Sequence, residues 1–371
     1  MGRVLVTVAA LVAVLGLGAL TPAEADSKTD SKTDSEAVSA GSSEPGSLVS
    51  PAGAADTAHG FASLEGGTTG GAGGQVVTVT TQAGLERYAA AEQPYVIRVA
   101  GTITAEPFGA NIAVASDKTI IGVGTTGELV QGELHLAPGT HNVIIRNLTI
   151  RDSSVEGDWD CKDTDFDGIQ MDTAHHVWID HNRFSRICDG QLDIRKDSEY
   201  VTVSSNRFED NNKTFGIGWT PNVKTQITID HNWFRGTKQR NPSADNCAFA
   251  HLYNNYMTAQ ADPGDPVWTY GNWSRGATRM VIENSYYDGV QHPYQADATA
   301  ELVQRGSILR NTTGRHEEWG AAFEPRDFYA YRLDPAAAVP GLVSRFSGPQ
   351  PLRFTATATQ PSLDPEEESR S

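Results

Sequence analysis

The sequence predicts an all-β protein whose fold is a right-handed parallel β-helix, a solenoid of stacked coils. A nine-residue phrase, in which apolar residues alternate with polar ones before a corner that contains Asn, occurs six times along the chain. The copies cover residues 142–150, 176–184, 200–208, 226–234, 249–257 and 279–287. They recur about every 25 residues, which is the repeat of a solenoid. Val, Ile and Thr are frequent in the phrases, and few segments have the period of an amphipathic helix, which favours strands.

The first coil is expected to carry a short helical cap. The segment QAGLERYAAAE, at residues 82–92, is the main helical candidate, and a terminal coil needs cover over its apolar column. A β-sandwich is the competing architecture, since its turns come roughly every 8 to 12 residues. Such a fold would not repeat one nine-residue phrase six times, so the β-helix is the preferred prediction.

The N-terminus has the features of a secretory signal peptide. An apolar run over residues 4–20 precedes Ala23 and Ala25, which form an A-x-A cleavage pattern. The sequence therefore predicts that residues 1–25 are removed and that the protein is secreted to the extracellular medium. A membrane anchor is the alternative, because the run is only slightly shorter than the ~20 residues that span a bilayer.

Composition divides the remaining chain into three parts. Residues 26–59 are rich in Ser, Asp, Gly and Pro, which predicts a disordered linker or pro-segment. Residues 351–371 end in DPEEESRS and are expected to form a solvated tail. The region between them, residues 60–350, is expected to form the β-helix domain.

The charge balance excludes some classes of partner. The 371 residues include 46 acids and 29 bases, for a formal net charge of −17. No concentrated basic patch is present, so neither nucleic acid nor an anionic membrane is expected as a partner. An anionic ligand would then need a bound cation as mediator. No feature of the sequence indicates an oligomer, and a monomer is expected.

The three cysteines allow one disulfide bond. Cys161 and Cys188 flank an acid-rich stretch, and export permits disulfides. A bridge between these two is predicted, which leaves Cys247 unpaired. The spacings of the cysteines match no zinc-binding pattern.

The stretch CDGQLDIRKDS, residues 188–198, contains the most informative strand. Because side chains alternate along a strand, turning Leu192 and Ile194 into the core places the polar side chains together on the opposite face. Those polar residues are Asp189, Gln191, Asp193 and Arg195. A single acidic strand most often just has a solvated face. The charged residues on the neighbouring coils therefore decide whether this strand is part of a functional site.

Neighbouring coils supply more charge beside this strand. Asp167, in DCKDTDFDGIQ, precedes the pair Asp189 and Asp193 by roughly one coil, so their carboxylates should converge. Converging carboxylates repel one another unless a proton or a cation lies among them, and oxygen ligands without His or Cys suit calcium. A solvated acidic loop is the ordinary alternative.

Positive side chains follow on the next coils. Lys213 comes one coil later, and Lys238 and Arg240 come one coil after that. Each of these cations alone would usually be a surface charge. Stacked beside the acidic cluster, they predict a groove that binds a polymer of acidic sugars.

Several phrases in the same order resemble one known family. The strings SDKTIIGVG, VIIRNLTIRD, VWIDHNRFS, DGQLDI, YVTVSSNRFEDNNKT, TIDHNWF and QRNP followed by HLYNNY are similar to the pectate lyase superfamily, polysaccharide lyase family 1. The resemblance extends over residues 60–310. It implies a secreted β-helical lyase that acts on an acidic plant cell-wall polysaccharide, pectate or polygalacturonate, with Ca²⁺ as cofactor.

The resemblance also implies a role for each charged residue. The implied calcium ligands are Asp165, Asp167, Asp189 and Asp193. The implied contacts with the substrate's acidic group are Lys213 and Arg195. Arg240 is implied as the base that removes the proton from C5 of the sugar, after which the C4 oxygen leaves and a 4,5-unsaturated end remains. Since arginine releases a proton only at high pH, alkaline conditions should favour the reaction.

One position departs from the family pattern. Asp245 occupies a substrate-binding position where the family commonly has a second arginine, which should reshape recognition of a neighbouring uronate. A lyase of the same fold for a different uronic-acid polysaccharide is therefore an alternative to a calcium-dependent pectate lyase. A β-helical hydrolase and a catalytically silent carbohydrate-binding solenoid are further alternatives. Trp219 and Tyr270 are expected to fill the core rather than to contact sugars.

Overall fold

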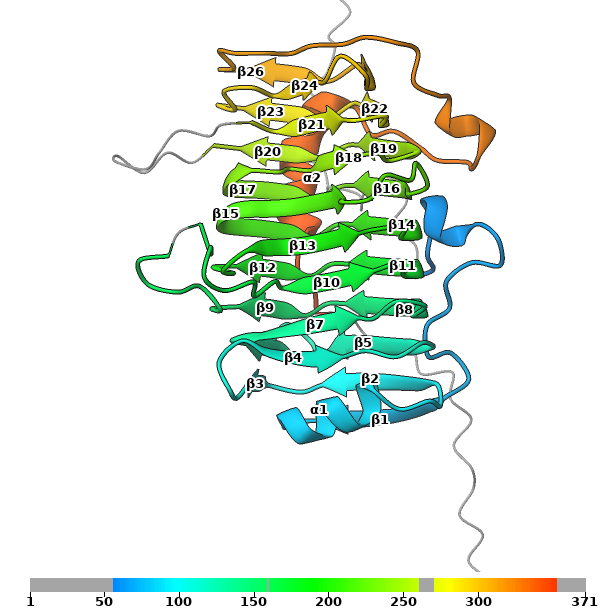
Figure 1. The fold of residues 1–371 in the computed structure, drawn as a ribbon, viewed down its shortest axis with the longest axis vertical. Coiled ribbons are helices and arrows are strands. Elements are labelled where there is room, and N and C mark those ends of the chain that lie inside the picture. Colours follow the sequence, from blue (N-terminus) through cyan, green and yellow to red (C-terminus); the bar gives the residue numbers. More distant parts are fainter. Residues whose placement is uncertain (1–55, 159, 260–269, 352–371) are drawn as a thin grey trace, which may run out of the picture. The chain divides into compact units, whose positions relative to one another are not determined.

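The computed structural model describes residues 56–158, 160–259 and 270–351. Within them the chain winds into a parallel β-helix, as the sequence predicts (Figure 1). The expected signal peptide, most of the expected linker and the tail after residue 351 lie outside the described residues. No helix of the described part is long and apolar enough to cross a membrane.

Three columns of parallel strands run along the solenoid. The first column, sheet A, consists of β1 (Gln75–Val79), β2 (Tyr95–Val99), β5 (Lys118–Gly122), β8 (His141–Arg146), β11 (His175–Asp180), β14 (Glu199–Ser204), β16 (Gln226–Asp230), β19 (Phe249–Tyr253), β22 (Arg279–Glu283) and β25 (Glu301–Arg305). The second column consists of β3 (Thr102–Thr104), β6 (Glu128–Val130), β9 (Thr149–Arg151), β12 (Arg183–Ser185), β15 (Arg207–Gly218), β17 (Trp233–Gln239), β20 (Tyr256–Thr258), β23 (Tyr286–Asp288) and β26 (Ile308–Arg310).

The third column carries the charged strand singled out above. It consists of β4 (Ala110–Ala113), β7 (Gly132–Leu136), β10 (Ile169–Asp172), β13 (Gly190–Arg195), β18 (Ser243–Asp245), β21 (Asn272–Arg275) and β24 (Tyr294–Ala296). The long strand β15 belongs to two columns. Its first residues pair with β12, and residues from Lys213 to Gly218 pair with β13.

Each repeated phrase forms a strand of sheet A, a corner and the start of a strand in the second column. In sheet A the parallel register places Ile179 beside Ile145 on one side and beside Val203 on the other, so that like residues stack through the core. In the second column the rings of Phe184, Phe208 and Phe234 stack, with centroids 5.1 and 5.0 Å apart. All of these side chains are fully buried.

The Asn in each corner forms a ladder between coils. The backbone N–H of Asn182 donates to Oδ1 of Asn206, and that of Asn206 donates to Oδ1 of Asn232. Each side-chain Nδ2 also donates to a backbone carbonyl, as from Asn206 to Ile179. Because buried corner groups would otherwise lack partners, the ladder explains why Asn recurs in the phrases.

The predicted cap is helix α1 (Gln82–Ala89), which begins after Thr81 and ends before residue 92. The Thr81 side chain accepts a hydrogen bond from the Gly84 N–H, a typical N-cap. Leu85 and Ala89 are fully buried, and the helix contacts β2 and β4. It therefore covers the apolar column at the first coil (Figure 1).

The last coil ends before residue 350, although the chain packs on the coils as far as Gln350, whose N–H donates to Oδ1 of Asn147 at 2.7 Å. After β26 the described chain forms two short 3₁₀ helices, Pro325–Asp327 and Ala336–Ala338, and helix α2 (Val339–Phe346), which contacts β20. The coils therefore end near Arg310 and not near residue 350. At the other end the ring of His59 hydrogen bonds to Asp230 at 2.8 Å, beside the 3₁₀ helix Gly60–Ser63, so His59 belongs to the fold and not to the expected linker.

Candidate active site

The outward face of the third column aligns residues from successive coils. Register places Gln170 beside Asp193, Asp193 beside Gly216, and Gly216 beside Ser243. Leu192 and Ile194 point into the core, as expected from the alternation, and are 0% exposed. The polar side is not a solvated face either, since Asp193 is only 4% exposed.

The structure brings the predicted aspartates together. One carboxylate oxygen from each of Asp165, Asp167 and Asp189 lies within 4.8 Å of the others. The Asp193 carboxylate lies against Gly190, where a Cβ atom would collide with it and would lie 3.0 Å from Oδ1 of Asp167. Glycine at this position therefore leaves the space into which the carboxylates converge.

Burial and mutual repulsion make this cluster costly in its ionised form. Burial, together with the charges of Asp193, Glu133 and Asp189, raises the pKa of Asp167 well above its usual range. Burial, with the charge of Asp189, also raises the pKa of Asp193 to about 7. Cation binding would relieve both effects, and a donor set made only of carboxylate oxygens fits a hard ion such as Ca²⁺.

Glu133 is a member of the cluster that the sequence analysis missed. It lies on β7, is 4% exposed, and its Oε2 accepts a hydrogen bond from the Asp167 backbone N–H at 3.2 Å. Glu133 could be recognised from the pairing of β7 with β10, which places it near Asp167. The long insertion between these two strands hides their register in the sequence.

Two cations reach the cluster from the next coils. The Lys213 ammonium lies 2.6 Å from Oδ1 of Asp189. Arg240 follows β17 and, among the described residues, has no ion pair; its charge lowers the pKa of Asp193 and Asp189 against the effect of burial. Its backbone carbonyl accepts a hydrogen bond from the Phe215 N–H at 2.7 Å, which fixes the chain at this point.

Arg195 has carboxylate partners of its own. Its Nε lies 2.9 Å from Oδ1 of Asp172, and its Nη1 lies 3.8 Å from Oδ2 of Asp165. Lys196 also pairs with Asp172, at 2.6 Å. Asp172 therefore holds both bases at the edge of the cluster, a pairing that the sequence analysis did not identify.

Several of these residues line one cleft of about 290 Å³. Its lining residues are Asp165, Asp189, Asp193, Arg195, Lys196, Trp219 and Arg240.

Trp219 is 50% exposed, so the expectation that it fills the core is wrong. It follows the end of β15 with a φ of 56°, and its ring lies over Gly216, where a Cβ atom would collide with it. Tyr270 is half-buried and packs edge-on against Trp273.

Four of the predicted charged residues do not line this cleft: Asp167 and Lys213, which lie beside its lining residue Asp189, and Lys238 and Asp245. Lys238 is buried, at 5% exposure. Asp245 pairs in register with Arg275 of the next coil, and its carboxylate lies where a Cβ atom on Gly276 would be. Asp245 therefore lies on the same coil as Arg240, along the outward face of the third column, without lining the cleft.

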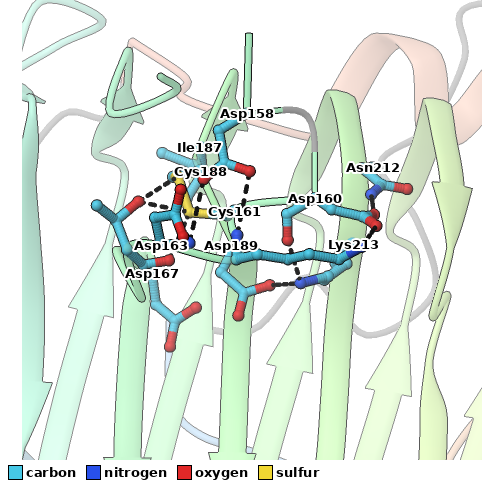
Figure 2. The surroundings of a disulfide bond; sticks show 12 residues. Asp158, Asp160, Cys161, Asp163, Asp167, Ile187, Cys188, Asp189, Asn212 and Lys213 are labelled. Atoms are coloured by element: carbon cyan, nitrogen blue, oxygen red, sulfur yellow. Dashed lines mark hydrogen bonds and ion pairs between the residues drawn. A yellow bond between two sulfur atoms is a disulfide. The ribbon is translucent and has the colours of Figure 1, made fainter. Parts of the chain in front are cut away.

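The predicted disulfide bond between Cys161 and Cys188 is present, with the Cα atoms 5.3 Å apart (Figure 2). It joins the acid-rich loop to the residue before Asp189. Cys247 is unpaired and fully buried, and burial raises the pKa of its thiol to about 12.

Comparisons with known proteins agree with this geometry. Residues 46–285 match the family described as pectate lyase. Pectate trisaccharide-lyases of Thermotoga maritima and Bacillus licheniformis are 34% and 32% identical to the chain, covering 81% and 78% of it and 90% and 85% of the relatives. A solved pectate lyase from Bacillus sp. N165, in complex with trigalacturonate, is 30% identical with a TM-score of 0.67, covering 78% of this chain and 98% of that one.

Fold, cleft and relatives together define a polysaccharide lyase of the parallel β-helix class. The family match covers more than half of the 371 residues. The chain belongs to the pectate lyase family.

Proposed function

We propose that the protein is a calcium-dependent pectate lyase that cleaves α-1,4-galacturonan by β-elimination and leaves 4,5-unsaturated oligogalacturonides. The observation that carries the proposal is a cleft lined by Asp165, Asp189, Asp193 and Arg240, with Asp167 and Lys213 directly beside Asp189. The names of the relatives, pectate trisaccharide-lyases and a pectate lyase in complex with trigalacturonate, support an acidic galacturonan as the substrate.

The residues that would hold Ca²⁺ are Asp165, Asp167, Asp189 and Asp193. A bound Ca²⁺ would supply positive charge that offsets the carboxylates and attracts the carboxylate of a uronate. The cluster alone repels such a substrate, so the proposal makes activity dependent on the cation.

Two basic side chains of the protein perform the elimination in this proposal. Lys213, as the ammonium, donates to the carboxylate of the sugar and stabilises the negative charge that grows there when the C5 proton leaves. Arg240 accepts that proton in its neutral form, which becomes more populated as the pH rises. The electron pair of the broken C5–H bond forms the C4=C5 double bond, and the C4–O bond breaks so that the glycosidic oxygen leaves with its electron pair. That oxygen takes a proton from solvent, and no water is added to the product.

Digestion of polygalacturonate tests the proposal. Near-ultraviolet absorbance should rise as unsaturated ends form, should rise faster toward alkaline pH, and should stop when a chelator is added. New reducing ends without absorbance would show hydrolysis and would overturn the proposal, as would activity that is unaffected by the chelator or that is highest in acid.

Asp245 favours a second candidate, a lyase for another uronic-acid polysaccharide. Its carboxylate adds negative charge beside the cleft, on the coil of Arg240, where a neighbouring sugar of a bound chain would lie. A rate comparison over polygalacturonate and other polyuronates decides between them, and preference for another polyuronate would support the second. For either candidate we propose a secreted monomer, since polymeric substrates lie outside cells; size-exclusion chromatography of the culture-medium protein tests this.

A further inference from the structure

Among the described residues, the Lys213 ammonium has two acceptors, and each lies next to one half of the disulfide bond. Nζ is 2.6 Å from Oδ1 of Asp189, the residue that follows Cys188. Nζ also donates to the backbone carbonyl of Asp160, the residue that precedes Cys161, at 2.7 Å. Figure 2 shows the ammonium between these two oxygens. The disulfide therefore joins the two segments that hold the lysine.

Within the described residues, the loop that carries Asp160 also meets the coil beneath it where Thr164 Oγ1 lies 3.1 Å from Sγ of Cys188 and where the Phe166 carbonyl accepts the Asp189 N–H at 3.0 Å. Asp158 organises it locally, because its carboxylate accepts the backbone N–H groups of Lys162 and Asp163, at 3.1 and 3.3 Å. The disulfide is the covalent tie between this loop and β13. Because Cys161 and Cys188 are only 5% and 4% exposed, the tie lies beneath the loop and not at its tip.

A second tie links the same loop to the coil of Arg240. Oδ1 of Asp160 accepts a hydrogen bond from Nδ2 of Asn212 at 2.8 Å. Oδ1 of Asn212 in turn accepts from Nε2 of Gln239 at 3.0 Å, and Gln239 directly precedes Arg240. The loop thus contacts the segment that carries Lys213 directly and is linked through Asn212 to the segment that carries Arg240.

We propose that the Cys161–Cys188 disulfide and Asp160 are positioning residues that hold the Lys213 ammonium toward the cleft. An ammonium has three N–H donors, and the two protein acceptors occupy two of them. The third remains for the carboxylate of a bound uronate. A lysine side chain otherwise samples many rotamers, so fixing it in advance spares that ordering cost when substrate binds. The inference rests on the proposed function, in which Lys213 contacts the substrate.

A double-mutant cycle tests the inference. It compares the wild type, the double variant Cys161→Ser and Cys188→Ser, the variant Lys213→Ala, and the combination of all three changes. The double serine variant should lose roughly tenfold or more in kcat on polygalacturonate, because a misplaced group costs rate in this range. In the Lys213→Ala background, the same serine changes should cause no further loss.

A purely structural disulfide would give a different pattern. An equal loss in both backgrounds would overturn the inference, and so would full activity of the double serine variant. Where Lys213→Ala is too slow to assay, calorimetric affinity for trigalacturonate is measured in the same four proteins, and the same non-additivity is expected. A wild type without lyase activity would refute the proposed function. If the wild type is active, the double-mutant cycle tests only the positioning role of the disulfide.

Two further variants keep the test informative if the serine variants fail to fold. Asn212→Ala retains the disulfide but removes the tie to the Asp160 side chain, and it should lower kcat more than it changes the Ca²⁺ affinity. Lys162→Ala is the matched control, since it removes only the exposed ion pair with Asp160 and should leave kcat unchanged. Unchanged kcat in Asn212→Ala, or equal losses in the two variants, would contradict the positioning role.

Discussion

The guanidinium of Arg240 lies over the indole ring of Trp219, with Cζ 5.5 Å from the ring centroid. The aromatic face attracts the cation without neutralising it, unlike a carboxylate partner. The indole is half exposed and lines the cleft. Trp219 therefore contacts Arg240 and presents an exposed apolar surface in the cleft.

Removal of this indole should weaken the reaction moderately. Trp219→Ala should lower kcat/KM on polygalacturonate about twofold to thirtyfold, because a cation–π contact of this kind contributes about 0.5–2 kcal/mol. Trp219→Phe should retain most of the activity. Trp319 is similarly exposed but does not line the cleft, so Trp319→Ala serves as the control. Equal losses in the two alanine variants would contradict a role for Trp219.

Gly190 should not tolerate a side chain. In Gly190→Ala the new methyl group meets the carboxylates of Asp193 and Asp167, so the cluster must open. We expect Ca²⁺ affinity, measured by calorimetry, to fall at least about tenfold and stability to fall by about 1–3 kcal/mol. Gly341→Ala is the control, because no heavy atom lies within 4 Å of the added methyl group. Normal Ca²⁺ affinity in Gly190→Ala would refute the convergence of the carboxylates.

Removal of one charge from the cluster should separate stability from function. Oδ1 of Asp193 accepts a hydrogen bond from the Gly216 N–H at 3.2 Å. In Asp193→Asn the side chain keeps this oxygen but loses the negative charge. In chelator, Asp193→Asn should therefore melt about 2 °C or more above the wild type, because one buried repulsion is gone. Added Ca²⁺ should raise the melting temperature of the wild type and not that of the variant.

The control for that comparison is Asp163→Asn, an exposed acid of the same loop. It should leave both the melting temperature in chelator and the response to Ca²⁺ unchanged. If Asp193→Asn were destabilised in chelator, or kept the full response to Ca²⁺, the cluster would not be a cation site.

Away from the cleft, His231 should make stability depend on pH. It lies between Asp230 at 2.8 Å and Asp334 at 3.1 Å, and these contacts raise its pKa to about 9 although burial opposes the charge. Since the folded pKa exceeds the ordinary value of about 6.5, this stabilisation is complete below pH ~6.5 and is lost as the pH rises through about 9.

The wild type should therefore melt at a lower temperature at pH 9.5 than at pH 6.5. The part due to His231 should be on the order of 2 kcal/mol. His231→Gln should be less stable at the lower pH and should show a smaller change with pH. His316→Gln, on the exposed surface, is the control. An unchanged pH profile in His231→Gln would mean that this network does not hold a charged histidine.

Much of the fold follows from local patterns. The six phrases correspond to a strand of sheet A, the Asn corner and the next strand, and the buried Asn ladder supplies the physical reason for their similarity. The alternation of β13 and the coil spacing were enough to bring Asp167, Asp189 and Asp193 together, because parallel stacking converts sequence period into proximity.

The remaining features depend on tertiary contacts that local pattern does not encode. Helix α2 has the sequence VPGLVSRF, with Pro, Gly and β-branched residues that disfavour helix, and it buries Leu342 and Val343. Trp219 looks like a core residue until the positive φ after β15 turns it outward. The partnership of Arg195 with Asp172 required the register of β13 on β10.

The most direct test of the account is the rate of unsaturated product formation by Arg240→Ala at saturating polygalacturonate and Ca²⁺. Loss of the base should lower this rate by about 10²–10⁴-fold or more. Calorimetry should show that affinities for Ca²⁺ and trigalacturonate change little, since the aspartate cluster and Lys213 remain. A variant that still formed unsaturated ends at the wild-type rate would contradict the assignment of this cleft as the site of proton removal.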